Sequence, residues 1–313
     1  MTALGLTGNM LWSLVGLYGI LVIASAVFFF LRQKHPGKDY EEVAQRIQSW
    51  WLMVTVFTAA MLLSRTISLV FFAFISFLAL KEYFSIIPTR RADRCVLFWA
   101  YVAIPVQYYW VSVGWYGMFI IFIPVYMFLF LPLSMVIIGE TKAFLRALGT
   151  LHWGLMTMVF SISHVAYLLV LPAAGNPAAG GAGLVLYLVF LTQFNDVAQY
   201  MWGKMLGRRK IIPKVSPNKT WEGFVGGVAT TTLLAVVLAP VLTPLSYPLA
   251  LTAGLVIGLG GFAGDVTISA LKRDIGVKDS GSLLPGHGGI LDRIDSLTYT
   301  APLFFHFVYY FCY

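Results

Sequence analysis

The chain has 313 residues, of which 59% are hydrophobic and 11% are charged, and its mean hydropathy is +0.82. A soluble domain of this composition would expose most of its apolar side chains to water, so a soluble fold is excluded. The formal net charge of +8 would suit a nucleic acid, but the basic residues lie in loops between apolar runs, which excludes a nucleic-acid partner.

The apolar runs are continuous, without the alternation of polar and apolar residues that marks the strands of a barrel. Runs of about 20 residues are the expected unit of a helical membrane span. The predicted fold class is therefore all-α, a polytopic integral membrane helical bundle with about 9–10 transmembrane helices. The expected spans are 11–31, 50–63, 66–80, 96–112, 115–138, 151–171, 184–202, 223–243, 248–270 and 297–313.

The distribution of positive charge predicts the topology of these spans. Every Lys and Arg residue except Arg65 falls in loops on one side. Under the positive-inside rule these loops are cytoplasmic and both termini lie outside. Spans 50–63 and 66–80 are short, but they are expected to form a hairpin, since a single crossing would put the basic residues of a neighbouring loop on the wrong side.

The segment from Pro172 to Gly183 is uncharged and rich in Gly, Ala and Pro, which predicts an external linker between two groups of helices. Residues 1–183 are expected to form an N-terminal scaffold of transmembrane helices that contacts membrane lipids. Residues 184–313 are expected to form a C-terminal catalytic region with cytoplasmic loops at 203–222 and 271–296.

Few ionisable residues lie in the apolar spans before this linker, and carboxylates appear beyond it. Asp196 lies near the inner end of one span, Glu222 opens the next, and Asp265 lies near the end of another. Because charges in spans are energetically costly, these positions indicate a functional site.

The loop before the span at 223–243 suggests an anion site. Ser216 precedes Pro217, a pattern that predicts an N-cap followed by proline in the first helical position. A helix N-terminus flanked by Lys214 and Lys219 would attract an anion.

The polar segment 269–295 combines three kinds of residue that suit phosphate chemistry with Mg²⁺. The basic residues suited to a polyphosphate are Lys272, Arg273, Lys278 and Arg293. The carboxylates suited to a hard cation are Asp279, Asp292 and Asp295. The glycines that allow close approach of backbone to a ligand are Gly286, Gly288 and Gly289.

Several motifs in roughly residues 195–297 resemble the phosphatidate cytidylyltransferase (CDP-diacylglycerol synthase) family. The motifs are Gly264-Asp265, Ser269, Leu271-Lys272-Arg273, Lys278-Asp279, the run PGHGGILDRIDS at 285–296, Lys214, Ser216-Pro217, and the run KTWEG at 219–223. The resemblance implies a polytopic enzyme of the bacterial inner membrane. It would condense CTP with phosphatidic acid, giving CDP-diacylglycerol and pyrophosphate with Mg²⁺.

The resemblance also assigns roles to individual residues. Asp265 and Asp292 are the expected metal ligands, and Asp196 is a candidate for a second cation or for the nucleotide. Ser269 and Lys272 follow Asp265 at i+4 and i+7, on one helical face. The catalytic candidates are Ser269, Lys272, Arg273, His287 and Arg293. The further substrate-binding candidates are Lys214, Ser216, Lys219, Thr220, Glu222, Lys278, Asp279, Gly288 and Gly289.

Several alternatives remain open at this point. His287 suits either a general acid for departing pyrophosphate or a hydrogen bond that fixes its loop. Asp279 and Asp295 would also suit ion pairs with Lys278 and Arg293.

The acceptor and the assembly state are open as well. The segment 196–200 is bulkier than the family's small-residue run, and Ile268 stands where the family has an acidic residue. These departures leave open another lipid phosphate as acceptor, and a CTP-dependent lipid kinase is a further alternative. A lipid transporter is disfavoured because the charges gather at one face and no internal repeat is found. The oligomeric state is open, a homodimer included.

Overall fold

The computed structural model describes residues 7–35, 40–89, 94–281 and 288–313. The long helices of the first half are α1 (Gly8–Lys34), α2 (Glu41–Leu63), α3 (Arg65–Ile86) and α4 (Arg94–Ser112). Two further rods contain π-helical turns: α5 (Tyr116–Ile121), η2 (Phe122–Met127) and α6 (Phe128–Ile138), and then α7 (Phe144–Gly154), η3 (Leu155–Phe160) and α8 (Ser161–Leu168). The second half contains α9 (Gly180–Leu206), α10 (Trp221–Leu242), α11 (Tyr247–Asp274), the short α12 (Leu291–Ile294) and α13 (Leu297–Cys312).

The all-α membrane bundle is confirmed. Among the described residues, seven helices are long and apolar enough to cross a membrane, and no strand is present. The remaining expected spans coincide with α4, with the α7–α8 rod and with α13, which has 16 residues.

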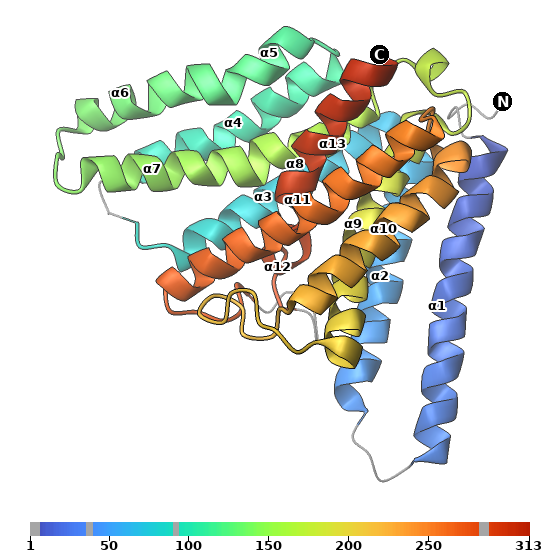
Figure 1. Cartoon of the computed structure of the whole chain (residues 1–313). Coiled ribbons are helices and arrows are strands. Elements are labelled where there is room, and N and C mark those ends of the chain that lie inside the picture. Colours follow the sequence, from blue (N-terminus) through green and yellow to red (C-terminus); the bar gives the residue numbers. More distant parts are fainter. Residues whose placement is uncertain (1–6, 36–39, 90–93, 282–287) are drawn as a thin grey trace.

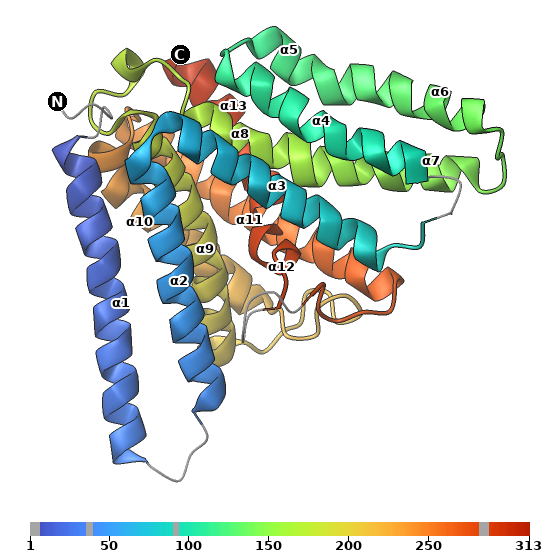
Figure 2. The ribbon, with the colours of Figure 1, turned by 180° about the vertical axis from the view of Figure 1, so that it is seen from behind.

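The expected hairpin at residues 50–80 consists of two separate helices that are longer than predicted. The chain breaks at Ser64, whose backbone is extended and whose hydroxyl accepts a hydrogen bond from Ile67 N. Figure 2 shows α2 and α3 diverging from this break. Both helices are among those long enough to span.

The linker predicted at 172–183 is tied to the bundle rather than loosely attached. It contains the short helix η4 (Ala173–Gly175), and α9 begins within it at Gly180. Asn176 is buried, and its Nδ2 donates to Gly180 O at 2.8 Å and to Leu242 O at 2.9 Å. This amide therefore joins the start of α9 to the end of α10.

Close packing of α9, α10 and α11 builds the core of the second half. A Cβ on Gly254 would lie 2.7 Å from Thr232 Cα, and one on Gly258 would lie 3.2 Å from Val228 Cα. These glycines let α10 and α11 approach closely, as small residues do in membrane helices. The side chain of Asn195 on α9 bonds both neighbours, accepting from Thr231 and donating to Gly258 O.

The described ends of the chain lie at one end of this bundle. The polar loops before α10 and before α12 lie at the other end (Figure 1). This placement brings the segments that carry the predicted chemistry to one end of the molecule.

Candidate functional site

The two predicted loops meet directly. Arg273 Nε at the end of α11 donates to Val215 O at 3.2 Å, and Lys219 Nζ lies 2.5 Å from Asp265 Oδ2. The loop before α10 therefore lies beside the end of α11.

The loop before α10 folds as a narrow hairpin. Lys210 and Thr220 form an isolated antiparallel bridge, and Trp221 N donates to Arg209 O at 2.9 Å. The carboxylate of Glu222 closes the hairpin, since it accepts hydrogen bonds from the backbone N–H groups of Arg208 and Arg209. Glu222 therefore shapes the loop that carries Lys219.

The prediction that Ser216 caps this helix is wrong. The N-cap is Thr220, whose hydroxyl accepts a hydrogen bond from Gly223 N at 3.1 Å. Ser216 instead lies in a turn in which its carbonyl accepts from Lys219 N. The bridge with Lys210 holds Thr220 in an extended conformation, and residues 217–218 form a turn, so the helix does not begin at Pro217.

Lys219 is the cation at the centre of the site. Its Nζ contacts Asp265, donates to Gln199 Oε1 at 3.0 Å and lies 5.6 Å from the centre of the Phe262 ring. Burial alone would lower the pKa of Lys219, but the carboxylates around it raise that pKa overall. Lys219 is therefore protonated at neutral pH.

Three carboxylates surround this ammonium group. Asp265 on α11 also accepts a hydrogen bond from Ser269 Oγ at 3.2 Å, as the shared helical face predicts. Asp196 on α9 accepts from Ser296 Oγ at 3.0 Å. Asp295 accepts from Ser296 N, and its pKa is raised by desolvation and then by the charges of Asp265 and Asp196. The cluster therefore crowds three carboxyl groups around one lysine.

This cluster requires a glycine at position 264. A Cβ there would clash with Asp295 O and lie 3.0 Å from Ser296 Cα, and backbone atoms cannot yield cheaply. We expect Gly264→Ala to lower the free energy of unfolding by about 1–3 kcal/mol because of this overpacking. Thermal melting in detergent measures the effect, with Gly149→Ala as the control because its Cβ would meet no atom within 4 Å. Equal melting temperatures of the two variants would contradict the close approach.

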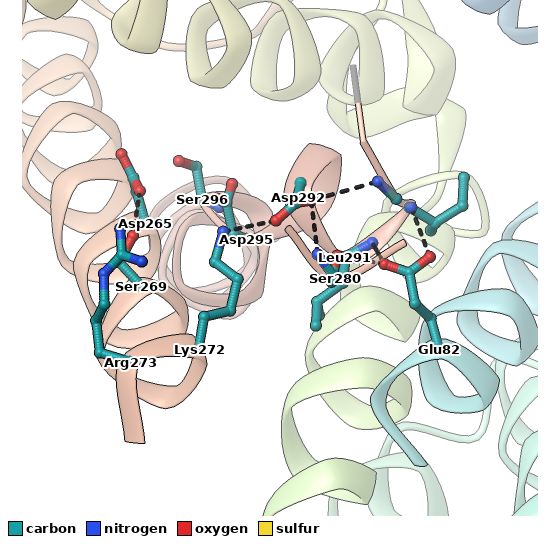
Figure 3. Close-up of polar contacts among 12 residues, drawn as sticks. Glu82, Asp265, Ser269, Lys272, Arg273, Ser280, Leu291, Asp292, Asp295 and Ser296 are labelled. Atoms are coloured by element: carbon teal, nitrogen blue, oxygen red, sulfur yellow. Dashed lines mark hydrogen bonds and ion pairs between the residues drawn. The ribbon is translucent and has the colours of Figure 1, made fainter. Parts of the chain in front are cut away.

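Asp292 lies in a second ion pair (Figure 3). Its Oδ1 is 2.6 Å from Lys272 Nζ, and its Oδ2 accepts from the backbone N–H groups of Ser280 and Gly289. Desolvation alone would raise the pKa of Asp292, but Lys272 and these amides lower it overall. Gly288 has φ +75°, a backbone conformation that favours glycine. A Cβ at this position would also lie 2.7 Å from Asp292 Oδ2, so a side chain would crowd the carboxylate.

The predicted metal pair is thus divided between two lysines. Asp265 is paired with Lys219, and Asp292 is paired with Lys272. In the view of Figure 3, Asp295 and Ser296 lie between Asp265 and Asp292. Among the described residues, no three His, Cys, Asp or Glu side chains form a group ready to hold a metal ion. The donors near Asp265 are nevertheless carboxylate oxygens, which suit a hard cation.

The other predicted residues vary in their surroundings. Lys214, Lys278 and Asp279 are exposed. The described structure contains no ion pair between Lys278 and Asp279 or between Arg293 and Asp295. The Nε atom of Arg293 is buried without a hydrogen-bond partner. His287 and Gly286 lie outside the described residues.

A cavity of about 390 Å³ opens beside Lys219, between the end of α9 and the start of α10. Its polar lining comes mainly from Asp196, Gln199, Lys204, Lys210, Asn218 and Lys219. The apolar side chains of Tyr200 and Phe224 complete one part of the wall. The cavity therefore offers both cationic and apolar contacts at one end of the bundle.

One residue at this end was missed by the sequence reasoning. Glu82 near the end of α3 accepts hydrogen bonds from Ile290 N at 2.9 Å and Leu291 N at 3.1 Å, and from Ser280 Oγ. A signal was present, because Glu82 is a carboxylate in an apolar helix without a basic residue at i±3 or i±4.

Comparison with known proteins gives consistent findings. A model of the cytidylyltransferase family matches residues 44–311. Uncharacterized protein YnbB of Escherichia coli (strain K12) is 48% identical over 301 residues, which is 96% of this chain and 99% of that protein.

Relatives with a named activity match over shorter regions. A phosphatidate cytidylyltransferase of Haemophilus influenzae is 43% identical over 135 residues, 42% of this chain and 47% of that protein. One of Staphylococcus aureus (strain COL) is 40% identical over 124 residues, 39% of this chain and 48% of that protein. The match thus spans about half the length of these two relatives.

Proposed function

This chain belongs to the cytidylyltransferase family of nucleotidyltransferase enzymes, and from that membership we propose that it transfers CMP from CTP to phosphatidic acid. The products would be CDP-diacylglycerol and pyrophosphate. The observation that carries this proposal is the contact of Lys219 with Asp265, because it joins the loop before α10 to α11 at a cluster of carboxyl groups.

The proposed reaction needs charge neutralisation more than it needs a base. A phosphate oxygen of the lipid is already anionic at neutral pH, and it attacks the α-phosphorus of CTP. One P–O bond forms to the lipid phosphate, and the bond from the α-phosphorus to the bridging oxygen breaks, so that pyrophosphate leaves with the electron pair. Alignment of the two anions and stabilisation of the leaving group lower the barrier.

The basic residues form two groups, and we assign one group to each substrate. We assign the lipid phosphate to the cavity beside Lys219, Lys204 and Lys210. The exposed aromatic side chains of Tyr200 and Trp221 near this cavity suit the boundary between lipid and water. Lys272, Arg273 and Arg293 are assigned to the phosphates of CTP, with Lys278 and Asp279 as further contacts. His287 remains a candidate acid for departing pyrophosphate.

We further propose that Mg²⁺ binds here, held by Asp265 and Asp292, with Asp196 available to a second cation. The crowding of three carboxyl groups, those of Asp196, Asp265 and Asp295, around one lysine supports this assignment. Bound Mg²⁺ would neutralise charge on the triphosphate. Asp295 lies in the same cluster and could share this task.

The proposed orientation follows from charge. The enzyme would lie in the bacterial inner membrane with this site toward the cytoplasm and both termini outside. Phosphatidic acid would then enter sideways from the inner leaflet, while CTP arrives from the cytoplasm. The oligomeric state does not enter the proposal, and a homodimer is compatible with it.

A second acceptor is favoured by one finding. The chain aligns along nearly its whole length with the uncharacterized Escherichia coli protein, but along about 40% of its length with the named phosphatidate cytidylyltransferases. A related lipid phosphate is therefore the alternative acceptor for the same transfer of CMP.

Cytidylyl transfer by the purified full-length protein tests donor, acceptor and cation together. The protein is incubated with CTP labelled at the α-phosphate and a panel of lipid phosphates, with Mg²⁺ or with EDTA. We expect label on phosphatidic acid, release of pyrophosphate and loss of both with EDTA. In a parallel reaction with CTP labelled at the γ-phosphate, label on the lipid would indicate a kinase. No transfer of either label to any acceptor would contradict the proposal.

A further inference from the structure

Glu82 connects the first half of the chain to the segment that carries Asp292. Its carboxylate accepts hydrogen bonds from Ile290 N, Leu291 N and the hydroxyl of Ser280, which are 198 to 209 residues away in sequence. This side chain therefore ties Ser280 and residues 290–291 to α3.

The donors of this contact suit a charged acceptor. Hydrogen bonds to a charged acceptor are stronger than those between neutral groups. Within the described structure no Lys or Arg forms an ion pair with Glu82, so the loop's own donors satisfy its charge.

The shape of the loop also fits this carboxylate. A Cβ on Gly281 would lie 3.1 Å from Glu82 Cδ, and one on Gly289 would clash with the carboxylate. Glycine at these two positions lets the backbone close around Glu82 from both sides.

The same stretches of backbone bind a second carboxylate. Ser280 donates its hydroxyl to Glu82 and its backbone N–H to Asp292. Gly289 N donates to Asp292, and the N–H of the next residue, Ile290, donates to Glu82. Figure 3 shows Ser280 between Glu82 and Asp292. A displacement of the segment from Glu82 would therefore also displace the donors that orient Asp292.

We propose that Glu82 is a positioning residue of the enzyme: it holds Ser280 and residues 289–291 against α3, so that Asp292 keeps its place beside Lys272. The consequence for catalysis rests on the proposed function, whereas the positioning itself can be measured without substrate. Glu82 contacts no substrate in this scheme and acts through Asp292.

Hydrogen exchange tests the positioning directly. We expect the amides of Ile290 and Leu291 to exchange at least about tenfold faster in Glu82→Gln than in the unmodified protein, because Gln has no charge and only one acceptor oxygen. Lys81→Gln is the matched control, since Lys81 is the exposed neighbour on the same helix. Unchanged exchange at 290–291 in Glu82→Gln would overturn the proposal, whatever reaction the enzyme catalyses.

Steady-state kinetics then test the consequence for catalysis. We expect Glu82→Gln to lower kcat about 10- to 100-fold with KM for CTP changed less than about threefold, and with the melting temperature retained. Glu82→Asp should recover part of kcat because it keeps the charge, although Gln matches the size of Glu better. Equal losses in the Gln and Asp variants, or a loss explained by a lower melting temperature, would indicate a merely structural role and overturn the proposal.

Failure of the two ideas can be told apart. Faster exchange in Glu82→Gln together with no cytidylyl transfer by the unmodified protein would refute the proposed function and support the positioning. Normal transfer with unchanged exchange and unchanged kcat in Glu82→Gln would support the function and refute the positioning.

Discussion

Replacing Asp265 with asparagine is expected to lower the rate of cytidylyl transfer by about 10²- to 10³-fold. Asparagine keeps the size of the side chain but removes the charge that faces Lys219, with which Asp265 is now paired at 2.5 Å. It also removes one of the two carboxylates proposed to hold Mg²⁺. Initial rates measured across a range of Mg²⁺ concentrations should show a higher concentration for half-maximal activity.

Asp274 provides a matched control for this substitution. It is an exposed aspartate at the end of the same helix, α11, and Asp274→Asn is expected to change the rate less than about twofold. If Asp265→Asn transferred CMP at a near-normal rate with an unchanged response to Mg²⁺, the metal assignment would be wrong.

Replacing Lys272 with methionine is expected to have the second large effect. The substitution leaves Asp292 partly buried without its cation, although the backbone donors at Ser280 and Gly289 remain. The free energy of unfolding should fall by about 1–3 kcal/mol, and transfer should slow by about 10²-fold or more because a proposed phosphate contact is lost. Thermal melting and initial rates measure the two effects separately.

The stabilising effect of Lys272 on the fold should depend on pH, and the lowered pKa of Asp292 sets the direction of that dependence. Because the pKa of Asp292 in the folded protein is below its ordinary value of 3.8, this group stabilises the fold above that value. The stabilisation is lost as the pH falls through the folded pKa. The difference in melting temperature between Lys272→Met and the unmodified protein should therefore shrink on acidification below about pH 4.

Lys34→Gln is the control for Lys272, since Lys34 is an exposed lysine at the end of α1. It should leave both the melting temperature and the rate nearly unchanged. If Lys272→Arg had the stability of the unmodified protein but the low rate of Lys272→Met, the ion pair with Asp292 would account for stability and the phosphate contact for the rate. A methionine variant as stable and as active as the unmodified protein would contradict both roles.

Properties set by local pattern could be predicted from the sequence. The apolar runs specify the helices because a membrane requires every backbone polar group to be bonded within its own helix. The i+4 spacing places Ser269 beside Asp265, and the charge distribution places the two polar loops at one end. Each of these follows from helix geometry or from the cost of charge in lipid.

Properties set by contacts between distant segments could not be predicted in the same way. The prediction of an N-cap at Ser216 was wrong because the bridge between Lys210 and Thr220 outweighs the tendency of a Ser-Pro pair to begin a helix. The ion-pair partners of Asp265 and Asp292 depend on how the loops fold back, which no spacing in the chain reveals. Glu82 escaped notice because its partners belong to the other end of the sequence.

That separation has a consequence for how the protein is made. Bacterial and other ribosomes add about 5–20 residues per second, so Glu82 is synthesised roughly 10–40 s before Ser280 and Leu291. During this interval α3 must enter the lipid with a carboxylate at its end, which water has to solvate at the bilayer surface. The hydrogen bonds of Glu82 therefore form only after the C-terminal part of the chain has been synthesised. In a nascent chain arrested before residue 280, this carboxylate should remain exposed to water.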